Sequence, residues 1–213
     1  MRKIELPKKF AIENIEIWNP DEILTARDIF VENGYIKKIA PHGTHRDLSY
    51  SKIETRFKQL IPAGVDAQAH LRIPGQAEKE TPTTGLRAAA KGGYAAILTM
   101  PNTKPVIDSA EVLSQAKALV QYAENEVGVK VFWSAALTKN QAGLELSNLL
   151  SISEAGAIAF TDDGKGVSSN EIMSEAFQVL SSLGLPLLQH AEMPGHGGVL
   201  APGPFQKSMG VNA

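Results

Sequence analysis

The stretch Ile61-Pro-Ala-Gly-Val-Asp-Ala-Gln-Ala-His-Leu-Arg-Ile-Pro-Gly75 begins as an apolar strand and ends as a polar loop. Alternate side chains of an extended chain share one face, which here carries Asp66, Gln68, His70 and Arg72. Such a polar face is typical either of an exposed edge strand or of a metal or substrate site at a strand's end. In the second case, His70 offers a ligand nitrogen and Arg72 a planar fork for a carboxylate.

After residue 61 the sequence alternates between strand-like and helix-like segments. Strands are expected to begin at Ile61, Ala95, Val129, Ala157 and Leu185. Starts about 30 residues apart are typical of repeated βα units that build a parallel sheet. The sequence therefore predicts an α/β domain over residues 61–213.

Helix signals lie between these strands. We expect helices over residues 84–91 and 144–155, and two more that begin at the capping residues Asp108 and Ser168. Each capping residue is followed three positions later by glutamate, which resembles a capping box. Gly184 is expected to end the last helix, because glycine adopts the left-handed conformation easily.

A doubly wound open sheet and a (β/α) barrel both fit this alternation. The first strand is followed by neither a G-x-G-x-x-G fingerprint nor a P-loop, either of which would favour the open sheet. Residues capable of chemistry instead follow several different strands, as in a TIM-type barrel. They are Gln68, His70, Arg72, Asn102, Asp162, Asp163, His190 and Glu192. We therefore predict a barrel of which only about the first five βα units are present.

Residues 1–60 have a different pattern, with short β-like segments and turns. Asn33-Gly34 stands between two strand-like segments, and this pair favours a two-residue type I′ hairpin turn. We expect a small β-rich subdomain here. His42 and His45 fall in its polar tail, where solvated loop residues are expected rather than metal ligands.

Composition excludes several classes of protein. With 213 residues, 43% of them hydrophobic, the chain can bury a sizeable core. A net charge of -2 without blocks of like charge argues against nucleic-acid and membrane-surface partners, and a cytoplasmic location is the default expectation. The absence of cysteine means that any metal site must use histidine and carboxylate ligands.

Four segments carry a family resemblance. Residues 64–75 resemble the G-x-D-x-H-x-H-x-R-x-P-G motif of the type I dihydroorotases, in the amidohydrolase superfamily. Met100-Pro-Asn-Thr103, Ala159-Phe-Thr-Asp-Asp-Gly164 and His190-Ala-Glu192 resemble the next three motifs of that family, in the same order. The resemblance extends over essentially the whole chain and marks it as similar to the N-terminal portion of such an enzyme.

The resemblance implies zinc-dependent interconversion of N-carbamoyl-L-aspartate and L-dihydroorotate in pyrimidine biosynthesis, with one or two zinc ions. It implies that His70 binds one metal, that Asp163 bridges two, and that His190 binds the second. Arg72 and Asn102 would hold the carboxylate of the small-molecule substrate. The general acid/base of the family lies on later strands, beyond Ala213, so no catalytic residue is assigned within this chain.

The sequence departs from the family pattern at Gln68, which replaces the first histidine of H-x-H. A carboxamide offers one weak oxygen ligand and no imidazole nitrogen, so the first metal position should be weakened. Met193 stands where the motif usually carries an acid, and His196 lies in a glycine-rich loop that is a poor replacement for a ligand.

Three functions remain open. The first is a dihydroorotase-like enzyme represented by its N-terminal part, with an isolated chain that is inactive. The second is a non-catalytic dihydroorotase-like partner, for example of aspartate carbamoyltransferase. The third is another cyclic amidohydrolase, such as a hydantoinase or allantoinase. Five strands leave two open edges, so we expect either a longer polypeptide or closure against another chain, including a homo-oligomer.

Overall fold

The computed structural model describes residues 6–55, 59–191 and 203–210. The chain divides into two compact units, Met1–Ala63 and Gly64–Ala213. Within the described ranges, no helix is long and apolar enough to cross a membrane. Glu192, Met193 and His196, discussed above, lie outside the described residues.

The first unit is a five-stranded sheet. Its strands are β1 (Lys9–Trp18), β2 (Ile23–Glu32), β3 (Tyr35–Pro41), β4 (Ser51–Ile53) and β5 (Gln59–Leu60). The order is β3-β2-β1-β4, and β5 pairs with β1. The antiparallel β2–β3 pair closes at Glu32 and Tyr35 through Asn33 and Gly34, whose φ angles are 51° and 81°. Both turn residues have positive φ, so the predicted hairpin is confirmed.

Among the described residues of this unit, Asp28 of β2 is the buried charged one, with 2% of its surface exposed. Its carboxylate accepts hydrogen bonds from the backbone N–H of Asn14 (2.9 Å) and of Gly43 (2.9 Å), and lies 2.7 Å from Nδ1 of His42. Burial acts to raise the pKa of Asp28, but these three partners outweigh it and hold the pKa below its usual range. His42 therefore has a structural partner and is not simply a solvated loop residue.

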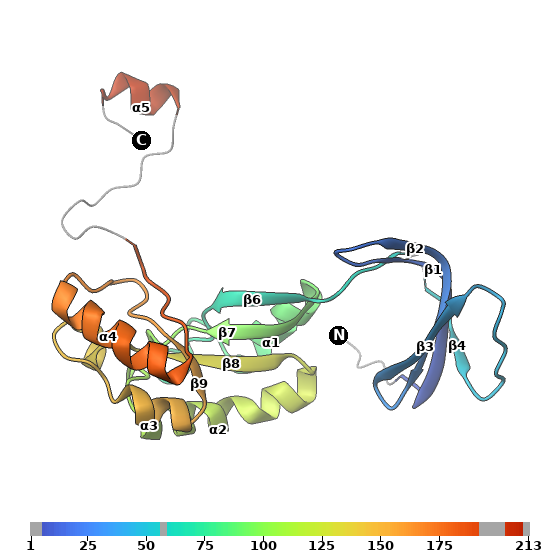
Figure 1. Ribbon diagram of the computed structural model, residues 1–213, viewed down its shortest axis with the longest axis horizontal. Coiled ribbons are helices and arrows are strands. Elements are labelled where there is room, and N and C mark those ends of the chain that lie inside the picture. The colour runs from blue at the N-terminus through green and yellow to red at the C-terminus, as the bar shows by residue number, and fades with distance from the viewer. Residues whose placement is uncertain (1–5, 56–58, 192–202, 211–213) are drawn as a thin grey trace. The chain divides into compact units, whose positions relative to one another are not determined.

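The second unit contains a parallel four-stranded sheet (Figure 1). Its strands are β6 (Gly64–Ala69), β7 (Tyr94–Thr99), β8 (Lys130–Ala135) and β9 (Ala157–Phe160), in that order. Helices α1 (Pro82–Lys91), α2 (Ala110–Val127), α3 (Leu149–Glu154) and α4 (Asn170–Leu183) alternate with the strands, and α5 (Pro204–Ser208) follows. The α/β class with a parallel sheet is confirmed.

One hydrophobic core joins this sheet to its helices. Alternate residues of β8, including Val131 and Trp133, pack with Leu86 of α1, Leu113 of α2 and Leu180 of α4. The fully buried positions on α2 recur at helical spacing, which is why this amphipathic segment folds onto the sheet. The core fixes the helices, and with them the loops that follow each strand.

Two helices begin one residue later than expected. Ser109, not Asp108, caps α2, and Ser169, not Ser168, caps α4; each serine oxygen accepts an N–H three residues on. Asp108 instead accepts a hydrogen bond from the backbone N–H of Asn140 (2.7 Å). Gly184 ends α4 with a φ of 66°, as predicted.

The helix expected over residues 144–155 is also shorter, and this prediction was wrong at its start. Helix α3 begins only at Leu149, with Asn148 as its cap. The preceding residues form a compact loop in which Thr138 bridges to Leu146. Asn140 and Gln141 have positive φ, a backbone conformation that a continuous helix does not allow.

The expected fifth strand, near residues 185–189, is reduced to a single parallel bridge between Phe160 and Leu187. Phe160 donates its N–H to the carbonyl of Pro186 (3.2 Å) and accepts from Leu188 (2.9 Å). Pro186 has no N–H to extend the ladder. The described residues therefore contain four full strands of the parallel sheet rather than five.

Candidate functional site

The sequence-predicted site residues lie at the carboxyl ends of neighbouring parallel strands. Gln68 lies near the end of β6, and His70 follows that strand directly. Asn102 follows β7, Asp163 follows β9, and His190 follows the Leu187 bridge. Parallel strands end at the same edge of a sheet, so residues far apart in sequence meet here.

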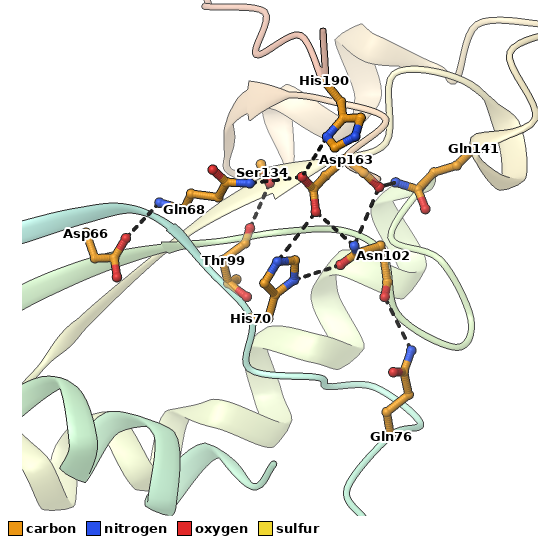
Figure 2. Close-up of polar contacts among 10 residues, drawn as sticks. All are labelled: Asp66, Gln68, His70, Gln76, Thr99, Asn102, Ser134, Gln141, Asp163 and His190. Atoms are coloured by element: carbon orange, nitrogen blue, oxygen red, sulfur yellow. Dashed lines mark hydrogen bonds and ion pairs between the residues drawn. The ribbon is translucent and has the colours of Figure 1, made fainter. Parts of the chain in front are cut away.

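Figure 2 shows that Asp163 is the centre of this group. Its side chain is buried, and each carboxylate oxygen accepts one amide N–H. Gln68 Nε2 donates to Oδ1 over 3.0 Å, and Asn102 Nδ2 donates to Oδ2 over 2.8 Å. The two histidines also face this carboxylate: His70 Nε2 lies 3.5 Å from Oδ2, and His190 Nδ1 lies 3.8 Å from Oδ1.

The strict alternation expected along β6 does not hold. The pairing of β6 with β7 shifts in register between Asp66 and Ala69. As a result, the adjacent residues Ala67 and Gln68 both line the same cavity. The backbone N–H of Gln68 donates to Oδ1 of Asp66 (2.9 Å), so the carboxylate of Asp66 turns back onto its own strand.

This cavity has a volume of 340 Å³ and is lined by part of the site, although His70, Asn102 and Arg72 do not line it. Gln68, Asp163 and His190 are part of its polar lining, and Met100 and Leu188 contribute apolar surface. A concave, partly apolar space with a few convergent polar groups is the usual form of a small-molecule site.

Arg72 lies two residues beyond His70 in the loop after β6, and it is half-buried. Its backbone adopts a positive φ of 59°, an uncommon conformation for a side chain of this size. Among the described residues, none forms a hydrogen bond or ion pair with its guanidinium.

Asp162, beside Asp163, has a structural role. It is 3% exposed, and its carboxylate accepts hydrogen bonds from the backbone N–H (3.0 Å) and the hydroxyl of Thr138. Burial raises the pKa of Asp162 above its usual range, although both Thr138 bonds act to lower it. Asp162 therefore ties the loop after β9 to the loop after β8.

Sequence reasoning missed two buried glutamines that support the site. Gln76 Nε2 donates to the backbone carbonyl of Asn102 (3.3 Å), and Gln141 Nε2 donates to that of Asp163 (3.4 Å). They are 6% and 3% exposed. Glutamine in a polar loop is usually solvated, so no local pattern distinguishes these two residues.

The donors around Asp163 suit a divalent cation only in part. Imidazole nitrogen and carboxylate oxygen are zinc ligands, and each histidine is paired with one oxygen of Asp163. Among the described residues, however, no three or more His, Asp or Glu side chains are grouped closely enough to hold an ion. At Gln68 the amide N–H, rather than a lone pair, points at Asp163.

A family model described as dihydro-orotase-like matches residues 57–207. The chain belongs to the dihydroorotase-like family. It is 36% identical over 206 residues to the dihydroorotase of Elusimicrobium minutum, a match that covers 95% of this chain and 46% of that protein. It is 40% identical over 180 residues to the dihydroorotase of Anoxybacillus flavithermus, covering 84% of this chain and 41% of that protein. The chain therefore spans less than half the length of these curated dihydroorotases.

Solved structures share the fold of this dihydroorotase-like chain. The L-hydantoinase of Arthrobacter aurescens matches with a TM-score of 0.70 and 22% identity, over 87% of this chain and 41% of that one. The D-hydantoinase of a Thermus species matches with a TM-score of 0.64 and 20% identity, over 84% and 39%. At these identities, the likeness concerns the fold alone.

Proposed function

We propose that this chain forms part of the active site of a dihydroorotase-like cyclic amidohydrolase. The reaction is the reversible hydrolysis of the ring amide of L-dihydroorotate to N-carbamoyl-L-aspartate, a step of pyrimidine biosynthesis. The observation that carries the proposal is the convergence of His70, Asn102 and His190 on Asp163 from the ends of separate strands. The family membership of the chain supports it independently.

The chain's own residues would bind and orient the substrate. Arg72 would hold the substrate carboxylate, because a guanidinium can meet both oxygens with parallel hydrogen bonds. Asn102 would add a second donor. Its Nδ2 lies 2.8 Å from Oδ2 of Asp163 and 3.5 Å from the backbone carbonyl oxygen of Asp163. The longer of these two hydrogen bonds can be exchanged for one to a substrate oxygen. Met100 and Leu188 would exclude water from one side of the ring.

His70, Asp163 and His190 are the residues that would hold zinc, as one or two ions, with Gln68 as a weak additional ligand. When bound, zinc polarises an amide carbonyl and lowers the pKa of a bound water to ~7. The amide of Gln68 already donates to Oδ1 of Asp163. We therefore expect the metal position beside Gln68 to bind zinc more weakly than the other position. The protein offers this carboxylate from a buried, hydrogen-bonded position, which limits its rotation.

We further propose that the four-stranded sheet is part of a (β/α) barrel. The similarity to two hydantoinase folds supports this, as does the gathering of site residues at the carboxyl ends of the strands. The remaining barrel strands would come from a longer polypeptide or from another chain.

The test is the hydrolysis of dihydroorotate by the polypeptide as it occurs in its source cells, with hydantoin and allantoin as competing substrates. We expect turnover of dihydroorotate that Asp163→Asn abolishes and that His45→Ala, outside the second unit, leaves unchanged. We expect little or no turnover by isolated residues 1–213. Equal activity of the Asp163→Asn variant would contradict the proposal, and preference for hydantoin or allantoin would change the substrate.

Gln68 also favours a second candidate, a non-catalytic dihydroorotase-like partner of an enzyme such as aspartate carbamoyltransferase. An amide that donates to Asp163 stabilises this carboxylate without any metal. The two candidates give different results in one preparation. The partner role predicts no turnover together with co-purification of a stable complex, whereas the enzyme role predicts turnover by the purified polypeptide.

A further inference from the structure

Both ends of the Asn102 side chain are engaged. Nδ2 donates to Oδ2 of Asp163 over 2.8 Å, and Oδ1 lies 3.0 Å from Nδ1 of His70. An ionised carboxylate only accepts hydrogen bonds, so the NH₂ group of Asn102 must face Asp163. Its carbonyl oxygen then faces His70, as Figure 2 shows.

This orientation determines which nitrogen of His70 carries the proton. The carbonyl oxygen of Asn102 only accepts, so Nδ1 of His70 must donate. In the neutral ring, Nε2 then has a free lone pair, which lies 3.5 Å from Oδ2 of Asp163. We propose that Asn102 is a positioning residue that holds His70 in the Nδ1-protonated tautomer.

The choice of tautomer has a chemical consequence. If Nε2 carried the proton, it would donate to Asp163, and this nitrogen could no longer act as a ligand or accept a proton. The partner of one imidazole nitrogen decides which nitrogen remains free for chemistry. Asn102 thus keeps Nε2 of His70 available, a role beyond binding the substrate carboxylate.

The backbone of Asn102 is also held by a hydrogen bond. Gln76 donates to its backbone carbonyl, and the oxygen of Gln76 accepts from Nζ of Lys79 (3.1 Å). Two residues after Asn102, Lys104 donates its N–H to the carbonyl of Pro74 over 3.1 Å. The loops after β6 and β7 are therefore joined at two points, and this restrains the Asn102 amide between its two partners.

The experiment is ¹⁵N nuclear magnetic resonance of the histidine rings in the metal-free full chain, recorded at increasing pH until the ring shifts no longer change. We expect Nδ1 of His70 to show the shift of a protonated nitrogen and Nε2 that of an unprotonated one. In Asn102→Leu, the order of the two shifts should reverse, because the carboxylate of Asp163 is then the nearest acceptor.

Gln141→Leu is the matched control: it removes a hydrogen bond to the backbone of Asp163 but leaves the contact between His70 and Asn102 intact, so the tautomer should not change. A protonated Nε2 in the unsubstituted protein would overturn the inference, even if Asn102→Leu failed to fold. So would an unchanged order of shifts in a folded Asn102→Leu variant.

The inference rests on the proposed function only for the use of the free nitrogen. Because the measurement needs neither metal nor turnover, its failure and a failure of the proposed activity can be told apart.

Discussion

Gln68 donates its Nε2 hydrogen to Oδ1 of Asp163 over 3.0 Å, across 95 positions of sequence. The same carboxylate oxygen faces Nδ1 of His190 at 3.8 Å. The amide N–H of Gln68 therefore donates to the same oxygen that would coordinate a cation beside His190. We therefore expect the residue at position 68 to influence whether the site binds a metal.

Gln68→His should raise the zinc content of the full-length protein, because an imidazole offers a nitrogen lone pair where the amide now offers a hydrogen. Elemental analysis of dialysed protein gives the number of ions per chain. Gln68→Leu is the control, since it removes the amide without adding a ligand and should not raise that number. Unchanged zinc in Gln68→His would mean that this side chain does not occupy a ligand position.

Gly75→Ala should destabilise the second unit by about 2–5 kcal/mol, the sum of left-handed backbone strain and overpacking. Gly75 has a φ of 83°, and an added Cβ would lie 1.6 Å from the carbonyl oxygen of Lys104. Gly93→Ala is the matched control: it has the same φ of 83° but nothing within 4 Å of the added carbon. Its cost should be about 1–2 kcal/mol. Urea unfolding of both variants measures the difference, and equal losses would argue against the close contact of the two loops.

Ser169→Ala should lower the free energy of unfolding by about 1 kcal/mol, because Ser169 Oγ accepts the N–H of Ile172 at the start of α4. Ser168→Ala should change it by less than about 0.5 kcal/mol, as for most exposed positions. Thermal unfolding of the two variants compares these neighbouring serines. A larger loss from Ser168→Ala would mean that the helix begins one residue earlier.

Asp28→Asn should cost about 1.5–3 kcal/mol of stability at neutral pH, the range for hydrogen bonds to a buried charged group. The folded pKa of Asp28 is depressed, so its stabilisation is fully present above the unfolded pKa of about 3.9 and is lost as the pH falls through the folded pKa. Asp28→Asn should therefore flatten the acid limb of the stability curve measured by circular dichroism. The exposed Asp21, replaced by Asn, is the control and should have little effect. An unchanged acid limb in Asp28→Asn would contradict this role.

Local sequence patterns were sufficient for much of the fold. Asn33-Gly34 predicted its hairpin because positive φ at both positions is a property of the two residues themselves. Strand β9 falls on residues 157–160, at its expected place, because a short apolar run between glycine and polar residues has few alternatives. The helix starts depended on tertiary contacts. Asp108 and Ser109 are both good capping residues, but Asp108 accepts a hydrogen bond from the loop at Asn140 and does not cap the helix.

The sequence by itself determined the kinds of chemical group at the site and their order along the chain, since His70, Asn102, Asp163 and His190 can be named from the motifs alone. Only the tertiary structure decided which atoms face each other. Hydrogen bonds such as those of Gln68 and Asn102 to Asp163 join residues 61 to 95 positions apart, and they depend on the register of parallel strands set by the core. The supporting roles of Gln76 and Gln141 have the same origin, because an amide in a loop has no local preference for a partner until packing excludes water from it.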